Sequence, residues 1–227
     1  MKIDSEYSGL VTKKFNEFFL VELKNKQNLR NSESFLCRVR KSINFKDQFI
    51  YVGDEVLINN IDLKSKRAVI KSLRKRKNLL IRPSVANISN IYVVCSVEEP
   101  ELNLSQVNRF LISAESMGVE VSLVLTKCDL ISSKRRSFLI EKFRHWGYQA
   151  ITLDLKKPDY FKNLLAELKK KKCSIFIGPS GVGKTTLLNM IIPGLENNTA
   201  PVSSKIKRGK NTTRNVELFS LSNKSYI

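Results

Sequence analysis

The sequence is poor in the residues that build metal and nucleophilic sites. It holds one histidine, His145, and four cysteines in 227 residues. His145 stands near the end of a predicted helix, where a capping or surface role is more typical than catalysis. The cysteines form no Cys-x-x-Cys pair, a spacing that zinc sites commonly use. We therefore expect neither a zinc site nor a Ser-His-Asp triad in this chain.

The chain also lacks a long apolar run and a recognisable secretory signal. No stretch of about 18 apolar residues is present that could span a membrane, and residues 1–4, Met-Lys-Ile-Asp, do not begin a signal peptide. The cysteines are widely spaced and lie mostly in apolar runs, as reduced thiols of a cytosolic protein do. We expect no membrane partner and a bacterial cytoplasmic location. A plastid stroma also fits, because the loss of a transit peptide would be invisible.

Acidic residues are scarce relative to basic ones. The chain has 21 Asp and Glu against 40 Lys and Arg, a formal net charge of +19. An excess spread along the chain favours a broad polyanionic partner such as ribosomal RNA. A lysine-rich composition also arises from an AT-rich genome, so the charge leaves both explanations open. With 42% hydrophobic and 27% charged residues, the composition fits a soluble protein with more than one domain.

One glycine-rich segment has the complete pattern of a phosphate-binding loop. Residues 178–185 read Gly-Pro-Ser-Gly-Val-Gly-Lys-Thr, which matches G-x-x-x-x-G-K-S/T between a predicted strand at 173–177 and a predicted helix at 185–192. The glycines would let backbone N–H groups surround a phosphate at the positive end of the helix dipole. Lys184 would reach the β- and γ-phosphates, and Thr185 would bind Mg²⁺. The candidate residues are Gly178, Pro179, Ser180, Gly181, Val182, Gly183, Lys184, Thr185 and Thr186.

A second motif, upstream of the loop, is suited to reading guanine. Residues 126–129 read Thr-Lys-Cys-Asp and follow a predicted strand at 119–125, at the end where open α/β sheets bind ligands. Asp129 would accept hydrogen bonds from guanine N1–H and its amine, a donor pair that adenine lacks. The motif usually begins with Asn rather than Thr, and a plain polar loop is the alternative. The candidate base-binding residues are Thr126, Lys127, Cys128 and Asp129.

The first 80 residues have the pattern of a small barrel. Short β-prone runs at 18–23, 34–39, 48–52, 55–58 and 67–70 are separated by polar turns. Such a five-stranded barrel, of the kind that binds oligonucleotides, would carry exposed cations toward phosphates. These cations are Arg38, Arg40, Lys41, Arg74, Lys75, Arg76 and Lys77.

From residue 88 onward, strands alternate with helices. The expected elements are strands at 91–97, 119–125, 149–153 and 173–177 and helices at 104–117, 133–146 and 159–172. This alternation predicts a covered, mainly parallel sheet. The predicted fold is therefore α/β: a small OB-like β-barrel at 1–80 followed by a circularly permuted P-loop GTPase domain at 84–227. The permutation follows from the base motif preceding the phosphate loop, the reverse of the usual order.

Five segments together resemble one family, the circularly permuted GTPases known as RsgA or YjeQ. They are residues 51–56, 76–87, 126–129, 178–185 and 208–218. The resemblance implies a monomeric GTP-binding and GTP-hydrolysing factor in late assembly of the small (30S) ribosomal subunit, which binds rRNA and uses GTP, GDP and Mg²⁺. It also implies that 208–218 is the switch that closes over the γ-phosphate, so Thr212 or Thr213 would bind Mg²⁺. It identifies no catalytic base in this chain.

The sequence departs from the family pattern at three places. Asn211 stands where the family usually has His, and no Ser-Ala element that supports the guanine is evident at 151–155. The sequence ends at Ile227, before the family's Asp-x-x-Gly motif and its zinc-binding domain, whose zinc ligands this chain does not contain. We expect an incomplete GTPase domain and leave hydrolysis open. Two alternatives remain: an RNA-binding remnant with a vestigial nucleotide site, or a P-loop ATPase or small-molecule kinase.

Overall fold

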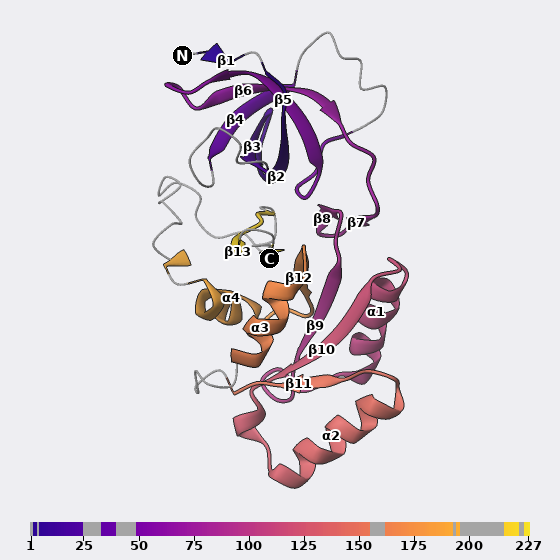
Figure 1. The fold of residues 1–227 in the computed structure, drawn as a ribbon. Coiled ribbons are helices and arrows are strands. Elements are labelled where there is room, and N and C mark those ends of the chain that lie inside the picture. Colours follow the sequence, from indigo (N-terminus) through magenta and orange to yellow (C-terminus); the bar gives the residue numbers. More distant parts are fainter. Residues whose placement is uncertain are drawn as a thin grey trace. The chain divides into compact units, whose positions relative to one another are not determined.

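The chain divides into two compact units. The computed structural model describes residues 2–3, 5–24, 33–39, 49–154, 162–192, 194–195, 216–222 and 225–227. The first unit takes its described residues from Met1–Ile88 and Lys210–Phe219, and the second from Ser89–Gly209 and Ser220–Ile227 (Figure 1). The functional ranges expected from the sequence, 1–80 and 84–227, stay a prediction, and each unit is described by itself.

The first unit is a closed β-barrel. Its strands are β1 (Lys2–Ile3), β2 (Tyr7–Phe15), β3 (Phe18–Leu23), β4 (Ser34–Val39), β5 (Glu55–Asp62) and β6 (Arg67–Leu73). The sheet order is β1-β5-β2-β3-β4-β6, and β6 also pairs with β5, which closes a ring of five strands. Only the β4–β6 pairing in that ring is parallel. This order is that of the OB-fold barrel, so the predicted barrel is confirmed.

The barrel differs from the sequence prediction in which segments form its strands. Residues 49–52 contribute no barrel strand, although Val52 forms a single bridge with Val85. The fifth strand is instead β2. The sequence prediction missed it because Lys13 and Lys14 interrupt its β-prone run. Alternate side chains of these strands fill the core. The fully buried core residues include Val11, Val21, Phe35, Cys37, Val56, Ile58, Ile61 and Ile70.

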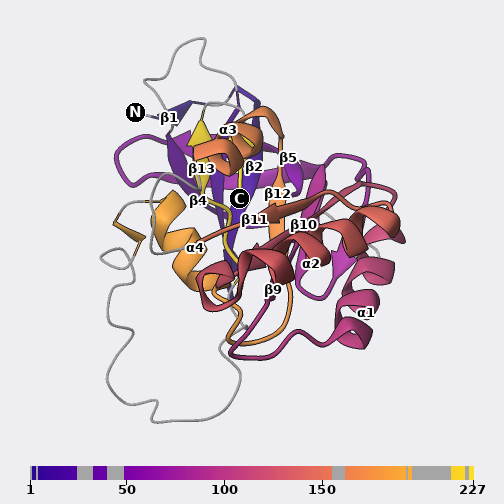
Figure 2. The same ribbon diagram turned by 90° about the horizontal axis from the view of Figure 1, so that it is seen from below.

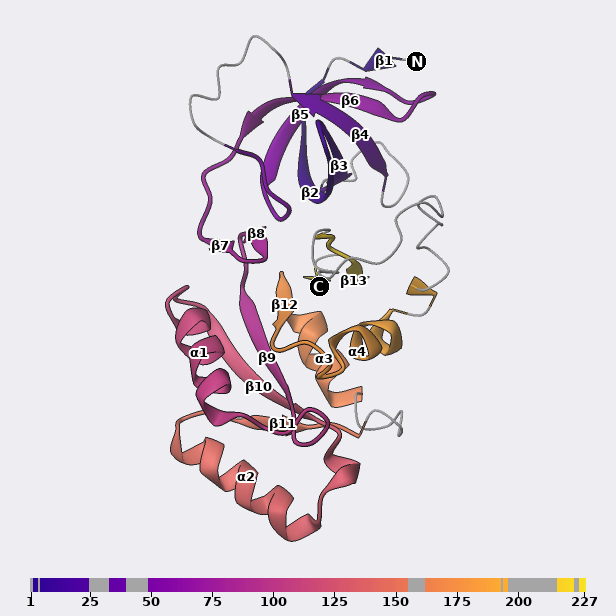
Figure 3. The same cartoon turned by 180° about the vertical axis from the view of Figure 1, so that it is seen from behind.

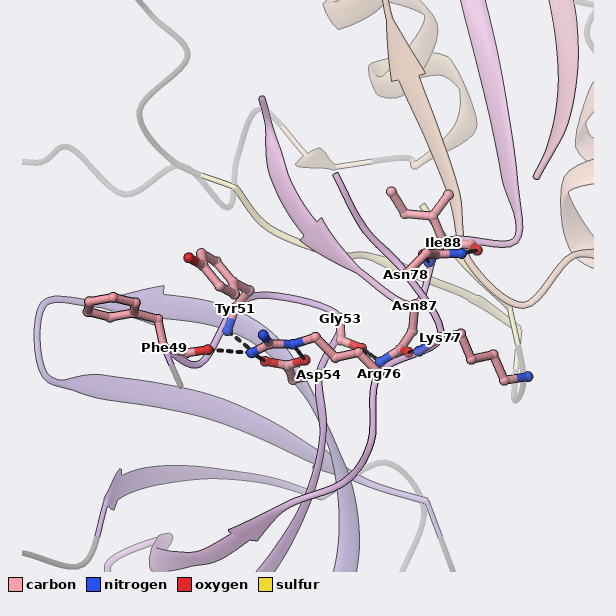
Figure 4. A network of polar contacts seen from close by, with 9 residues as sticks. All are labelled: Phe49, Tyr51, Gly53, Asp54, Arg76, Lys77, Asn78, Asn87 and Ile88. Carbon is pink, nitrogen blue, oxygen red and sulfur yellow. Dashed lines mark hydrogen bonds and ion pairs between the residues drawn. The ribbon is translucent and has the colours of Figure 1, made fainter. Parts of the chain in front are cut away.

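A buried ion pair anchors the segment that leaves the barrel after β6. The guanidinium of Arg76 donates from Nε to Asp54 Oδ1 at 2.6 Å and from Nη2 to Asp54 Oδ2 at 2.7 Å. It also donates to the Phe49 carbonyl and stacks 4.9 Å from the Tyr51 ring centroid (Figure 4). The sequence grouped Arg76 with the exposed cations, but its charge is engaged by a carboxylate that is fully buried. Such a fork geometry fixes the backbone on both sides of the pair.

Two asparagines continue this anchor into the hairpin of β7 (Leu79–Ile81) and β8 (Ser84–Ala86). Asn87 accepts from Lys77 N and donates to the Gly53 carbonyl, both within 2.9 Å. Asn78 accepts from Ile88 N at 2.9 Å (Figure 4). Gly53 has φ +87°, and a Cβ there would lie 2.1 Å from the Ala86 carbonyl oxygen, so only glycine fits. The polar bonds at Gly53 therefore position the hairpin base.

The second unit is a parallel sheet with helices on both sides. Its sheet order is β11-β10-β9-β12, with all pairs parallel. The strands are β9 (Asn90–Ser96), β10 (Glu120–Thr126), β11 (Ala150–Thr152) and β12 (Ser174–Ile177). The helices are α1 (Leu104–Glu115), α2 (Ser133–His145), α3 (Lys162–Lys170) and α4 (Lys184–Ile191), with a 3₁₀ turn at Cys128–Leu130. This α/β arrangement confirms the predicted fold class.

The strand β9 is the centre of this sheet. Every residue of β9 is buried, as expected of a parallel strand covered on both faces. Figures 1 and 3 show the sheet between α1 on one side and α3 and α4 on the other, and Figure 2 gives the same elements from below. A short antiparallel pair, β13 (Ser220–Ser222) and β14 (Ser225–Tyr226), follows, and Tyr226 bridges to Cys173 beside β12. Among the described residues, no helix is long and apolar enough to cross a bilayer.

The cysteines provide a test of the packing of both units. All four are free and buried, and burial raises the pKa of Cys37, Cys95 and Cys173 to about 12. At pH 8 only about one in 10,000 of these thiols would be ionised. We expect no measurable reaction of the folded chain with a thiol-reactive disulfide reagent, and four equivalents after unfolding in guanidinium. A thiol that reacts in the folded chain at the rate of free cysteine would contradict this packing.

The Asp54–Arg76 pair is expected to dominate the stability of its segment. Asp54→Asn leaves the Arg76 guanidinium without its buried partner, which should lower the free energy of unfolding by about 3 kcal/mol. Urea denaturation followed by circular dichroism measures this change. The matched control is Glu6→Gln, which breaks the half-exposed pair with Lys71 and should cost about 1 kcal/mol or less. Equal effects of the two substitutions would show that the buried pair is no anchor.

Candidate functional site

The sequence motifs converge on one edge of the parallel sheet. The phosphate loop follows β12, the Thr-Lys-Cys-Asp motif begins at the last residue of β10, and residues 153–154 follow β11. Because parallel strands present their carboxyl ends at the same edge, the three loops share that edge. The chain order of these loops is 126, 153, 178, which is the permuted order.

The phosphate loop lies between β12 and α4, the strand and helix that the motif requires. Gly178, Gly181 and Gly183 have φ values of +148°, +81° and +94°. A Cβ at Gly178 would approach the Val94 carbonyl oxygen to 2.1 Å. Glycine is therefore needed for both the backbone angles and the close approach of the loop to β9. The loop ends directly at α4, whose N-terminus carries the positive end of the helix dipole.

Lys184 is held against the loop that it closes. Its ammonium group donates to the Gly178 carbonyl at 2.9 Å and to the Pro179 carbonyl at 2.5 Å. Partial burial lowers the pKa of Lys184, because desolvation disfavours the charged form. An anion seated in the loop would offer this ammonium stronger acceptors than two neutral carbonyls.

The two threonines after Lys184 lie at the exposed start of α4. Thr185 and Thr186 are both exposed, so the Thr185 hydroxyl is open to solvent. In the part of the chain that the structure describes, no group of three His, Cys, Asp or Glu side chains comes together as a metal site. The other expected metal residues, Thr212 and Thr213, lie outside the described residues.

Thr126 links the two motifs directly. It is fully buried at the end of β10, and its hydroxyl lies 2.6 Å from the Val182 carbonyl and 3.2 Å from the Cys95 carbonyl. A hydroxyl has one proton, so the shorter distance marks Val182 as its acceptor. The residue that departs from the usual motif therefore ties the 126–129 motif to the phosphate loop, 56 residues away in sequence.

Lys127 contacts a loop that sequence reasoning overlooked. It has φ +57°, and its ammonium donates to the Glu99 carbonyl. Beside Glu99, the Pro100 carbonyl accepts from Ser96 Oγ at 2.7 Å, and Pro100 lies next to Gly181. The segment after β9 thus lies against both motifs. Its sequence, Val-Glu-Glu-Pro-Glu, carries no motif that would have revealed this.

Cys128 and Asp129 have different surroundings within the 3₁₀ turn. The Cys128 side chain is buried, and burial raises the pKa of its thiol. Asp129 is exposed, so of the two side chains only its carboxylate is open to solvent. Arg136 donates to the Cys128 carbonyl at 2.8 Å and holds the turn in place.

The loop after β11 adds a further carboxylate at the same edge. Leu153 N donates to the Leu125 carbonyl at 2.7 Å, which continues the β10–β11 pairing by one residue. Asp154 follows and is only 8% exposed. Sequence reasoning found no guanine-supporting element here and did not single out Asp154. Its only signal was an acidic residue at the end of a predicted strand.

A cavity of about 490 Å³ lies away from these loops, between β11 and α3. Its lining residues are Gln149, Ala150, Ile151, Thr152, Asn163, Leu164 and Glu167. None of them belongs to either motif. We place the candidate site at the motif loops because they combine glycine-rich backbone, the partly buried Lys184 and the carboxylate of Asp129, whereas the cavity lining contains no part of either motif.

Comparison with known proteins identifies the family of the chain. The family model described as RsgA GTPase matches residues 73–227. The small ribosomal subunit biogenesis GTPase RsgA of Prochlorococcus marinus (strain NATL2A) is 38% identical over 230 residues, which cover 98% of this chain and 74% of that protein.

Solved structures give the same result. The crystal structure of YjeQ from Thermotoga maritima superposes with a TM-score of 0.78 at 28% identity, covering 98% of this chain and 73% of the other. The structure of YloQ, described as a circularly permuted GTPase, superposes with a TM-score of 0.72 at 25% identity, covering 98% and 70%. From the matched family model, the identity to the curated relative and these structural likenesses, we conclude that the chain belongs to the RsgA GTPase family.

Proposed function

We propose that this chain binds GTP with Mg²⁺ at the edge formed by the phosphate loop and the 126–129 motif, and that it acts in late maturation of the small ribosomal subunit. The supporting observation is the 2.6 Å contact between the Thr126 hydroxyl and the Val182 carbonyl. This contact ties the 126–129 motif to the phosphate loop, as a single nucleotide site would require. The 126–129 motif alone would not be distinguished from a polar loop.

In this proposal the loop residues supply donors for the phosphates. Backbone N–H groups of 178–183 and the N-terminus of α4 face the β-phosphate, and Lys184 exchanges its carbonyl acceptors for phosphate oxygens. An ammonium group has three N–H donors, and two carbonyls lie within 2.9 Å of the Lys184 nitrogen. Asp129 accepts from guanine, and Lys127 lies along the base.

The residues present fit Mg²⁺ held through the nucleotide. Mg²⁺ keeps several waters and needs one or two protein oxygens besides phosphate, and the exposed Thr185 hydroxyl at the start of α4 provides one. When bound, Mg²⁺ would neutralise charge on the β- and γ-phosphates. Thr212 and Thr213 stay candidates for a second hydroxyl.

The barrel is proposed to contact ribosomal RNA. Arg38 is exposed on β4, and its guanidinium lies 4.3 Å from the Phe18 ring centroid. Lys14 on β2 lies 5.6 Å from the Phe19 ring. Cations braced on aromatic rings are pre-organised for phosphates. The curated relative is named for small ribosomal subunit biogenesis and comes from a cyanobacterium, so we propose the small subunit as partner, in a bacterial cytoplasm or plastid stroma.

The first test is nucleotide choice. We expect the purified chain to bind GTP with Mg²⁺ at least about 100-fold more tightly than ATP, because adenine leaves Asp129 without its donors. Asp129→Asn should weaken GTP binding and allow XTP to bind, because the changed base edge of XTP matches the amide. Isothermal titration of both proteins with the three nucleotides measures this.

Other outcomes of the titration point elsewhere. Equal affinity for ATP, unaffected by Asp129→Asn, would favour an ATPase or kinase. Loss of all nucleotide binding, with retained binding to small-subunit RNA, would favour an RNA-binding protein with a vestigial nucleotide site.

The second test concerns Thr126. Thr126→Val removes the hydroxyl without changing shape, so GTP affinity should fall about tenfold, the worth of one buried hydrogen bond. Thr126→Ser should restore it, and the GTP-to-XTP ratio should not change because Asp129 is intact. If the Thr126→Val protein binds GTP like the wild type, the hydrogen bond between the motifs does not contribute to GTP binding.

A further inference from the structure

The outward surface of α2 carries an exposed aromatic ring among cations. Leu139 and Phe143 form the buried side of this helix. Phe138 lies on another side and is 63% exposed, although a phenyl ring gains most from burial. The Nζ of Lys142, one turn later, lies 5.9 Å from the Phe138 ring centroid. Lys134, one turn earlier, is exposed. Residues 134, 138 and 142 therefore form a stripe along the helix, which we call the α2 stripe.

Helix stability explains Lys142 but not Lys134. The last turn carries Lys142, Arg144 and His145, and positive charges there stabilise the helix by interacting with the negative end of its dipole. The first turn has no acidic residue and instead begins Ser-Lys-Arg-Arg, which places positive charge at the positive end of the dipole. The positive charge of Lys134 therefore lowers the stability of the start of the helix.

The neighbouring arginines have partners within the fold. Arg135 pairs with Glu98 at 3.3 Å, and Arg136 donates to the Cys128 carbonyl at 2.8 Å. The one acidic residue of the helix, Glu141, is engaged by Arg144 at 2.6 Å. Packing and capping thus give no reason for Lys134 or Phe138, and the ammonium of Lys142 lies beside the same ring.

We propose that the α2 stripe is a binding surface for single-stranded RNA, in which an unpaired base stacks on Phe138 and the flanking phosphates contact Lys134 and Lys142. An exposed aromatic ring between cations is the combination that binds single strands without sequence preference. Eight residues separate the two lysines, about 12 Å along the helix axis, which leaves room for a base between two phosphates. This surface belongs to the second unit, whereas the barrel forms the first. The inference rests on the proposed function for its RNA partner.

The test is binding of a labelled 12-nucleotide single-stranded RNA to the full chain, measured by fluorescence anisotropy over a range of salt concentrations. Phe138→Ala should weaken binding about tenfold without changing the salt slope, because stacking releases no counterions. Phe138→Tyr should bind like the wild type. Lys134→Gln combined with Lys142→Gln should reduce the log–log salt slope by about 1.4, or 0.7 for each phosphate contact on a single strand.

The matched control is Ile112→Ala on α1. Ile112 is 68% exposed, but Asn108 and Ser116, rather than lysines, stand one turn on either side. This substitution should leave RNA affinity unchanged. A light-induced crosslink from 5-iodouridine in the same RNA should fall on the peptide that contains Phe138.

Three results would overturn the inference. The first is RNA affinity of Phe138→Ala within twofold of the wild type. The second is full affinity of Phe138→Leu, which would indicate an apolar contact such as a protein partner. The third is an unchanged salt slope in the double lysine variant.

GTP titration of the same variants separates this inference from the proposed function. If GTP and small-subunit binding are normal but RNA affinity does not depend on Phe138, only the inference is wrong. If the wild type binds neither GTP nor the small subunit but binds RNA in a Phe138-dependent way, only the proposed function is wrong.

Discussion

The parallel pairing of β10, β9 and β12 is the constraint on which the site depends. Residue by residue, β9 aligns with β10 through Ser96 and with β12 through Val93. This register brings segments more than 50 residues apart in the chain to one edge of the sheet. It places Thr126 within hydrogen-bonding distance of Val182. A slip of one residue would turn the side chain of Thr126 to the other face of the sheet and break the link between the motifs.

The site is assembled from backbone groups as much as from side chains. Lys127 and Lys184 both donate to carbonyls of nearby loops, and the Thr126 hydroxyl does the same. Such bonds hold the loops in place before any nucleotide binds, so less ordering is needed on binding.

In the barrel unit, polar contacts hold the chain segment that follows the last barrel strand. Asp54 is fully buried and is neutralised by Arg76, whose planar group also stacks on Tyr51. A buried carboxylate is tolerated only with such complete hydrogen bonding. The result is a rigid base for the β7–β8 hairpin, supported by Asn78 and Asn87. In this unit a polar cluster, rather than apolar packing, sets the path of the backbone.

The sequence by itself determined the phosphate loop, the α/β alternation of the second unit and the barrel of the first, because these depend on local spacing and periodicity. It placed a strand at 48–52, whereas the bonds that hold 51–54 come from Asp54 and Arg76, 22 residues apart. It missed β2 because Lys13 and Lys14 interrupt the β-prone run. It also treated Thr126 as a departure from a motif. Only the tertiary structure decided that its hydroxyl reaches Val182, that Pro100 lies beside the phosphate loop and that Phe138 stays exposed. Each of these depends on which strands pair and which faces meet, and a linear pattern of residues does not contain that information.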